Sequence, residues 1–205
     1  MNPNWAEENL QTIRTLMERS ALYRRALAPI MFLAGAMGVL AAAAGLILRL
    51  ESNRAFGALW LSTAIIAVAG AFLIARRQAL KDSEPFWSPP TRRVTQALVP
   101  PLFAGLCMGG LVLIICPRDI EVIAALLWAL FYGCALHAAG FFMPRGIRWF
   151  GWCFILSSCA LLYILMLAQI DFPINGHWLM GFFFGVLHLA YGAYLYLTEK
   201  GKNAA

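Results

Sequence analysis

The chain has 205 residues, of which 61% are hydrophobic and 13% are charged, and its formal net charge at pH 7 is +6. Soluble domains carry about twice this share of charged residues, so the composition indicates a membrane protein and leaves no length for a soluble catalytic domain. The positive charge belongs to the loops between apolar segments, and no nucleic-acid partner is expected.

Residues 1–26 predict an amphipathic helix that lies along the cytoplasmic surface of the membrane. Glu7 and Glu8 stand near its start, where the helix dipole favours anions. On a helical projection the apolar side chains, among them Trp5 and Leu10, fall on one broad face and the charged side chains fall on the other. We expect an anchoring element, and a docking surface for a partner is the less favoured alternative.

Six apolar segments follow, and each is near the roughly 20 residues that cross about 30 Å of hydrocarbon. Charged residues occur in them only at the first position of two, Glu121 and Arg148. The predicted fold is therefore an all-α bundle of six transmembrane helices over 27–198, followed by a cytoplasmic tail, 199–205. The predicted spans are about 27–48, 55–75, 97–116, 121–143, 148–168 and 176–197.

The first span is rich in small residues, including Gly35, Gly38 and Gly45. Small side chains let helix backbones approach closely in a membrane, where packing rather than the hydrophobic effect holds helices together. We expect tight packing of this span, either inside the bundle or against another membrane protein.

Alternate loops divide the cationic residues unequally. Three of the sixteen, Arg49, Arg54 and Arg118, fall on one side, and the other thirteen fall on the side that carries both termini. Loops with an excess of Lys and Arg stay in the cytoplasm when a membrane protein is inserted. The sequence therefore predicts that both termini are cytoplasmic.

The longest connection between predicted spans runs from Arg76 to Gln96. It carries Phe86 and Trp87 beside three prolines, which cannot continue a helix, and between two clusters of basic residues. We expect an irregular cytoplasmic loop there. Phe86 and Trp87 either rest at the level of the lipid headgroups, which is the favoured interpretation, or dock a partner.

The connection from Gln169 to His177 is predicted on the opposite side of the membrane. It is the outer connection that offers several polar side chains, including Asn175 and His177. We expect a solvated turn, and the mouth of a substrate path is the alternative.

His137 in the fourth predicted span and His188 in the sixth each have glycines at helical spacing on either side. Residues three and four apart share a helix face, and glycines let helices approach closely, so both imidazoles are expected in helix contacts. Tyr132 and Tyr191 lie beside them and complete the set of candidate ligand-binding residues. The predicted helix-packing glycines are Gly133, Gly140, Gly181, Gly185 and Gly192.

Three roles are open to His137 and His188. A neutral imidazole that hydrogen-bonds a neighbouring helix is the favoured interpretation. Two inward histidines could also supply axial ligands to a haem, but their predicted depths differ by roughly 5 Å. A quinone-binding or proton-sensitive site is the third. Since the sequence has no metal-ligand spacing, nucleophile motif or phosphate-binding loop, we predict no metal, no cofactor and no enzymatic activity.

Several stretches resemble a group of small bacterial integral membrane proteins to which no activity is assigned. The resemblance covers most of the chain and implies a six-helix protein of the bacterial inner membrane. Its most recognisable element is an FGxxHxxYG pattern in the last span. The stretches are Glu8-Asn9-Leu10, Leu16-Met17-Glu18-Arg19-Ser20, Leu127-Trp128, Tyr132-Gly133 and Phe184-Gly185-Val186-Leu187-His188-Leu189-Ala190-Tyr191-Gly192.

These observations favour a membrane accessory, sensor or scaffold protein that acts through helix packing and its basic cytoplasmic face. Its partners would be the lipid bilayer and another membrane protein or a cytoplasmic protein. The rival hypothesis is a protein that binds or transports a small apolar or amphipathic molecule within the bundle. A redox protein with haem or quinone is the third and least favoured hypothesis.

Overall fold

The computed structural model describes residues 26–81, 83, 85–115, 120–168 and 175–203. The described residues form helices joined by turns, and six of these helices are long and apolar enough to cross a membrane, which confirms the predicted fold class. The predicted amphipathic helix at 1–26 lies outside the described residues except for its last position. The elements are the first span Ala26–Ile47, α2 Asn53–Lys81, α3 Pro89–Ile115, α4 Glu121–Ala139, α5 Gly146–Ala168 and a last span made of α6 Gly176–Met180, the π-helical turn η1 Gly181–Val186 and α7 Leu187–Asn203.

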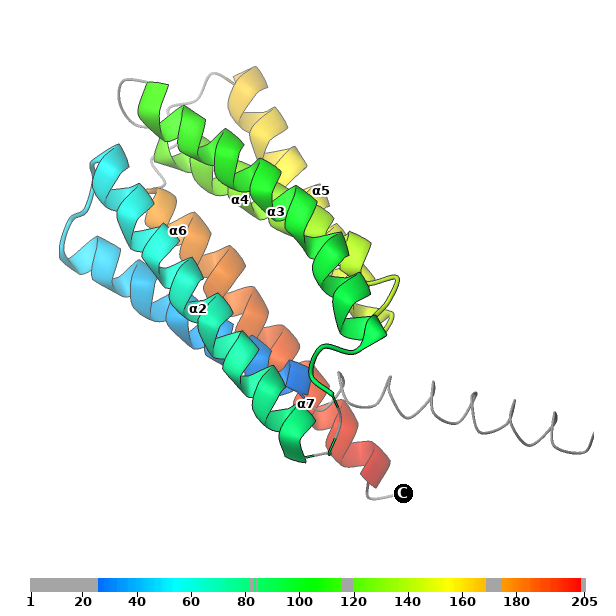
Figure 1. Ribbon diagram of the computed structural model, residues 1–205. Helices are drawn as coiled ribbons and strands as arrows, with labels where there is room; N and C mark the ends of the chain where they lie inside the picture. Colours follow the sequence, from blue (N-terminus) through cyan, green and yellow to red (C-terminus); the bar gives the residue numbers. More distant parts are fainter. Residues whose placement is uncertain (1–25, 82, 84, 116–119, 169–174, 204–205) are drawn as a thin grey trace, which may run out of the picture.

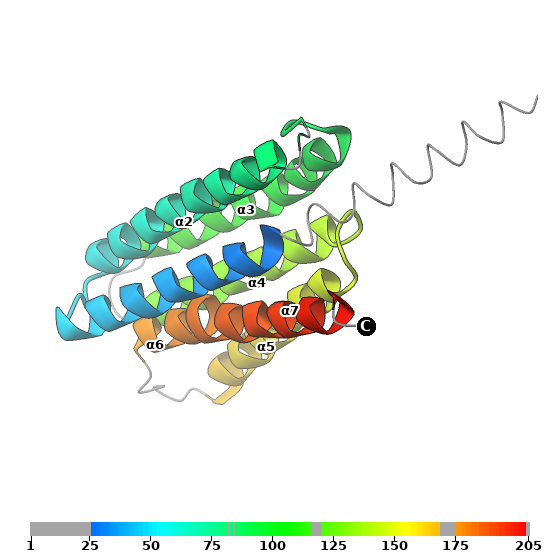
Figure 2. The same ribbon diagram turned by 90° about the horizontal axis from the view of Figure 1, so that it is seen from below.

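The helices pack as two layers of three (Figure 1). One layer holds α2, the first span and the last span, and the other holds α3, α4 and α5. Figure 2 shows α2 next to α3, the first span over α4, and the last span next to α5. Following the chain therefore leads around the bundle from each helix to a neighbour, and the last span returns to the first.

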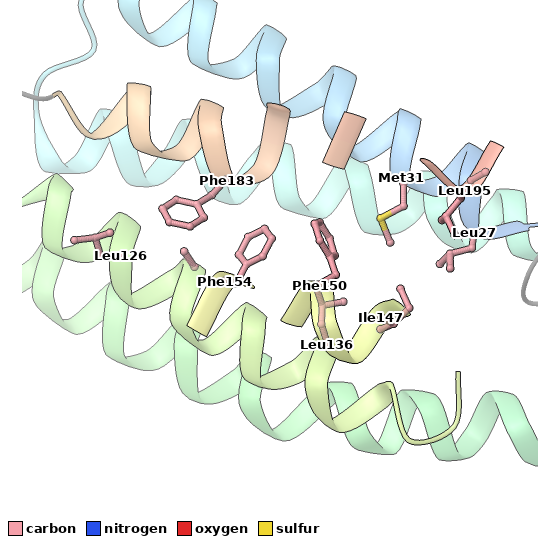
Figure 3. Close-up of a cluster of buried hydrophobic side chains, with 11 residues drawn as sticks. Leu27, Met31, Leu126, Leu136, Ile147, Phe150, Phe154, Phe183 and Leu195 are labelled. Carbon is pink, nitrogen blue, oxygen red and sulfur yellow. The ribbon is translucent and has the colours of Figure 1, made fainter. Parts of the chain in front are cut away.

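The apolar core fills the space between the two layers. Phe150 and Phe154 of α5 meet Phe183 of η1 there, and Met31 of the first span lies farther along the same cluster (Figure 3). A second cluster joins α2, α3 and α4 around Phe56, which is fully buried. Close packing of aromatic rings with alanines thus holds the two layers together, as expected where lipid removes the hydrophobic driving force between helices.

Within the first layer, small residues bring the first and last spans together. A Cβ atom added at Gly38 would lie 2.5 Å from the carbonyl carbon and oxygen of Phe184. Gly185 meets Val39 and Gly192 meets Met31 in the same way. The packing predicted for the first span is therefore found inside the bundle.

Exposed aromatic side chains mark both ends of the helices. On α5, Trp149 and Tyr163 are exposed and lie about 21 Å apart along the helix axis. On the last span, Trp178 and Tyr194 are exposed at about 24 Å. Trp and Tyr collect at membrane interfaces, so these belts fit a hydrocarbon layer that crosses the middle of the bundle.

The α2–α3 and α4–α5 connections lie at one end of the bundle, which we call the basic end (Figure 1). The predicted irregular connection over 76–96 was too long, because α2 continues to Lys81 and α3 already begins at Pro89. Proline suits the first turn of a helix, where its missing N–H is not needed. At the C-terminus α7 runs to Asn203, so most of the predicted tail continues the last helix.

Candidate functional site

Tyr132 and His188 form a hydrogen-bonded pair between α4 and α7. The Tyr132 hydroxyl and His188 Nε2 are 2.7 Å apart, and His188 Nδ1 lies 3.0 Å from the carbonyl oxygen of Phe183. A carbonyl only accepts, so Nδ1 carries the proton and donates to Phe183, and Nε2 of the neutral ring accepts from the Tyr132 hydroxyl. Both nitrogens of this imidazole are therefore used inside the protein.

The π-helical turn η1 explains why the Phe183 carbonyl is available to His188. At the end of η1, the N–H of Leu187 donates to the carbonyl of Phe182, five residues earlier. Where a helix returns from this spacing to the usual four, one carbonyl in the turn loses its backbone donor. The imidazole of His188 occupies that position and satisfies the carbonyl.

Aromatic rings enclose the His188 imidazole, which is 1% exposed. Phe150 and Phe154 contact it edge-on with ring centroids 5.3 Å and 5.7 Å away, and Phe184 stacks on it at 5.9 Å. An axial ligand to haem would have to give up one of the two hydrogen bonds and displace these rings. The geometry matches the favoured interpretation, an imidazole that hydrogen-bonds a neighbouring helix.

Tyr191 lies next to this pair and differs from it in one respect. Its ring stacks on Phe150 with centroids 4.4 Å apart and 9° between the planes. Its hydroxyl is buried close to Gly146 and has no hydrogen-bond partner among the described residues. Buried polar atoms in proteins are nearly always paired, so this hydroxyl is an exception that needs an explanation.

His137 belongs to a different part of the bundle from the other three candidate residues. Its half-exposed ring contacts Phe141 and Trp152 at the basic end, with centroids 5.5 Å and 5.2 Å away. None of these side chains touches His188. The structure thus divides the candidate ligand-binding set, because Tyr132 and His137 lie on different faces of α4.

The predicted helix-packing glycines all lie at close helix contacts, but with different partners. Gly133 and Gly140 face α5, where an added Cβ atom would meet Phe154 and Arg148 respectively. Gly181, Gly185 and Gly192 face the first span. In the FGxxHxxYG stretch the glycines therefore contact the first span, while His188 and Tyr191 contact the layer of α4 and α5.

His177 was predicted in a solvated turn, and that prediction was wrong, because the side chain is 1% exposed. Trp60 Nε1 donates to His177 Nδ1 at 3.1 Å, so Nε2 carries the proton and donates to the carbonyl of Leu50, also at 3.1 Å. Asn175 caps α6 by accepting from the N–H of His177 at 2.8 Å. This single imidazole joins the first span, α2 and the last span at the end opposite the basic end.

The backbone after the first span is shaped to receive His177. Arg49 adopts a left-handed conformation, with φ 49°, and the N–H of Leu50 donates to the carbonyl of Gly45 at 3.0 Å. This is a Schellman-type helix end, in which the chain turns sharply. The turn presents the Leu50 carbonyl to His177. A left-handed arginine gives no signal in the sequence, which explains why the contact was missed.

At the basic end, Phe86 and Trp87 differ in how far their side chains are buried. Phe86 is half-buried and packs edge-on against Phe72 of α2, with centroids 4.8 Å apart. Trp87 is 58% exposed. Five exposed basic side chains surround this turn on α2 and α3, namely Arg76, Arg77, Lys81, Arg92 and Arg93. Asp82 and Glu84, in the same connection, lie outside the described residues.

Six apolar helices of membrane-spanning length, with aromatic belts near both ends, define this chain as a multi-pass membrane protein. No protein-family model, curated protein or solved structure matches it. Among the described residues, no three His, Cys, Asp or Glu side chains are grouped so that they could hold a metal ion.

We expect Tyr132→Phe to lower the free energy of unfolding by about 1 kcal/mol, because it leaves the buried Nε2 of His188 without a donor. Tyr191→Phe is the matched control and should change stability by less than about 0.5 kcal/mol, since it removes a hydroxyl that has no partner. Equilibrium unfolding in mixed micelles measures both. An equal loss in the two variants would mean that the Tyr191 hydroxyl has a partner outside the described residues.

Proposed function

We propose that this protein is a non-catalytic accessory or scaffold protein of the bacterial inner membrane, which acts through its basic face. The observation that carries the proposal is the contrast between the two places where a partner could bind. The polar groups of Tyr132 and His188 are consumed by hydrogen bonds within the bundle. Trp87, in contrast, is exposed among exposed basic side chains of α2 and α3.

The basic end is proposed to face the cytoplasm. Seven described arginine and lysine side chains lie there, whereas Arg49 and Arg54 are the described ones at the other end. An excess of Lys and Arg in cytoplasmic loops supports this orientation, and with it cytoplasmic termini. The resemblance of the FGxxHxxYG stretch to small bacterial membrane proteins supports the bacterial inner membrane.

The chemistry of the basic face favours an acidic segment of a protein as its partner. Arg76, Arg77 and Lys81 on α2, with Arg92 and Arg93 on α3, provide the positive charge. Trp87 provides a large amphipathic ring, and tryptophan and arginine are enriched at binding hot spots. Phe86 is then a support for the turn, because its ring is already packed against Phe72.

A photo-crosslinking amino acid in place of Trp87 tests this proposal in intact membranes. We expect one discrete protein adduct, reduced at least about tenfold by Arg92→Glu with Arg93→Glu, because like charges across an interface are repulsive. Trp149 is the matched control position, since it is also exposed at the basic end but belongs to the aromatic belt of α5. Equal adducts at both positions, or an adduct that ignores the charge reversal, would contradict the proposal.

The rival function, binding of a small amphipathic molecule within the bundle, retains one specific observation. The Tyr191 hydroxyl and the Ser158 hydroxyl are both buried between the layers without a partner. A polar group bound beside Gly146 would satisfy the Tyr191 hydroxyl, and the Ser158 hydroxyl, about 18 Å farther along α5, would need a second one. The Tyr191→Phe variant described above separates the two functions, because under the rival function it should lose the stabilisation that a ligand provides.

A further inference from the structure

At the basic end, the α4–α5 corner gathers four side chains on the outer surface of the bundle. Arg148, in the first turn of α5, lies over the ring of Phe141 with its guanidinium carbon 5.2 Å from the ring centroid. His137 and Trp152 contact each other beside it. Gly140 makes this arrangement possible, because a Cβ atom there would collide with the side chain of Arg148.

The charge of Arg148 is not neutralised within the described part of the chain. The carboxylates whose side chains the structure describes, Glu51 and Glu121, both lie at the opposite end of the bundle. Arg145 is exposed three residues earlier and adds a second positive charge. The N-terminus of α5 adds the positive end of a helix dipole. The corner therefore attracts an anion.

His137 adds a hydrogen-bond donor to the corner. Its Nδ1 is buried and has no partner. The other ring nitrogen, Nε2, is at the half-exposed edge of the ring, where it can donate to a ligand when it carries the proton. One donor from His137 and the forked donors of Arg148 then border the same surface, and such a fork matches phosphate oxygens.

We propose that the α4–α5 corner, formed by His137, Phe141, Arg148 and Trp152, binds the phosphate headgroup of an anionic phospholipid. Exposed apolar side chains flank the corner, namely Trp149 on α5 and Phe142 after α4, and both would lie along the acyl chains. Basic sites between transmembrane helices at the interface suit such headgroups. This inference requires only that the chain spans a membrane, and it is independent of the function proposed for Trp87.

A lipid is favoured over free phosphate because the corner stands in the aromatic belt. Trp149 is 75% exposed and Phe141 is 64% exposed, directly beside the charged groups. Such side chains are covered by lipid in a membrane. A soluble anion would leave this apolar surface uncovered, whereas a phospholipid covers it with its chains.

Native mass spectrometry of the full chain, purified in a neutral detergent and titrated with dioleoyl-phosphatidylglycerol or dioleoyl-phosphatidylcholine, tests the proposal. We expect at least about tenfold tighter binding of phosphatidylglycerol, and an about tenfold loss in Arg148→Gln. Arg145→Gln is the matched control, because it removes the same charge from the same connection. Its affinity for phosphatidylglycerol should fall by less than about threefold. Inorganic phosphate should compete weakly.

Three results would overturn the proposal. One is an equal loss of phosphatidylglycerol affinity in Arg148→Gln and Arg145→Gln, which would show that the positive charge attracts the lipid without a defined site. Another is the absence of any preference for phosphatidylglycerol, and the third is competition by inorganic phosphate at the concentration of the lipid. A melting temperature in lipid-free detergent reports whether Arg148→Gln is folded. If Arg148→Gln is not folded, Arg148→Lys takes its place. This variant keeps the positive charge but lacks the forked guanidinium group, and it should bind phosphatidylglycerol about threefold more weakly.

Discussion

Replacing His177 with alanine should lower the free energy of unfolding by about 3–5 kcal/mol, the largest effect we expect from one side chain. The substitution leaves the buried N–H of Trp60 and the carbonyl of Leu50 without partners, at about 1–3 kcal/mol for each unpaired group. It also opens a cavity against Phe56, whose ring centroid is 5.0 Å from the imidazole. Equilibrium unfolding in mixed micelles measures the loss.

Two further variants show whether the effect comes from the hydrogen bonds. His177→Gln keeps one acceptor and one donor and should recover more than half of the loss. His137→Ala removes a half-exposed imidazole whose buried Nδ1 has no hydrogen-bond partner in the described part of the chain, and it should cost less than about 1 kcal/mol. If the alanine variants at 177 and 137 were equally stable, His177 would not join the three spans as described.

Gly38→Ala should destabilise the bundle by about 2–3 kcal/mol, the second largest effect. The new methyl group would stand 2.5 Å from the carbonyl of Phe184 and 2.7 Å from the backbone nitrogen of Gly185. Backbone atoms cannot rotate away as a side chain can, so the first and last spans must separate. A lower melting temperature in detergent is the expected measurement.

Gly110→Ala is the matched control on α3 and should not destabilise the bundle. An added Cβ atom at Gly110 meets no atom within 4 Å. Alanine is favoured over glycine in a helix by up to about 1 kcal/mol, so stability should be unchanged or slightly higher. Equal destabilisation by the two variants would contradict the close contact assigned to Gly38.

The spans were predictable because the cost of placing a segment in a bilayer depends on its length and composition alone. The first span ends at Ile47, within one residue of the predicted end at 48, and Glu121 begins both the predicted and the observed fourth helix. Helix ends outside the membrane were less predictable. α2 extends to Lys81, beyond the predicted end at 75, because polar residues with good helix propensity can continue a helix into water.

The candidate site was predictable only in part. Glycines beside His188 indicated that its ring lies in a helix contact, and it does. The same pattern around His137 indicated the same, and its ring does contact Trp152 of α5, but it lies half-exposed at the basic end and apart from His188. Glycine spacing reports where helices approach, and it does not report which neighbouring face receives the side chain between them.

The sequence by itself determined that this protein crosses the membrane six times and gathers its positive charge at one end, because both properties are sums over residues. Only the tertiary structure decided the partners of the three histidines. The π-helical turn adds a residue to the helical repeat and frees the Phe183 carbonyl for His188, and the left-handed Arg49 turns the Leu50 carbonyl toward His177. Both histidine contacts depend on backbone geometry that packing imposes, so no local sequence pattern predicts them.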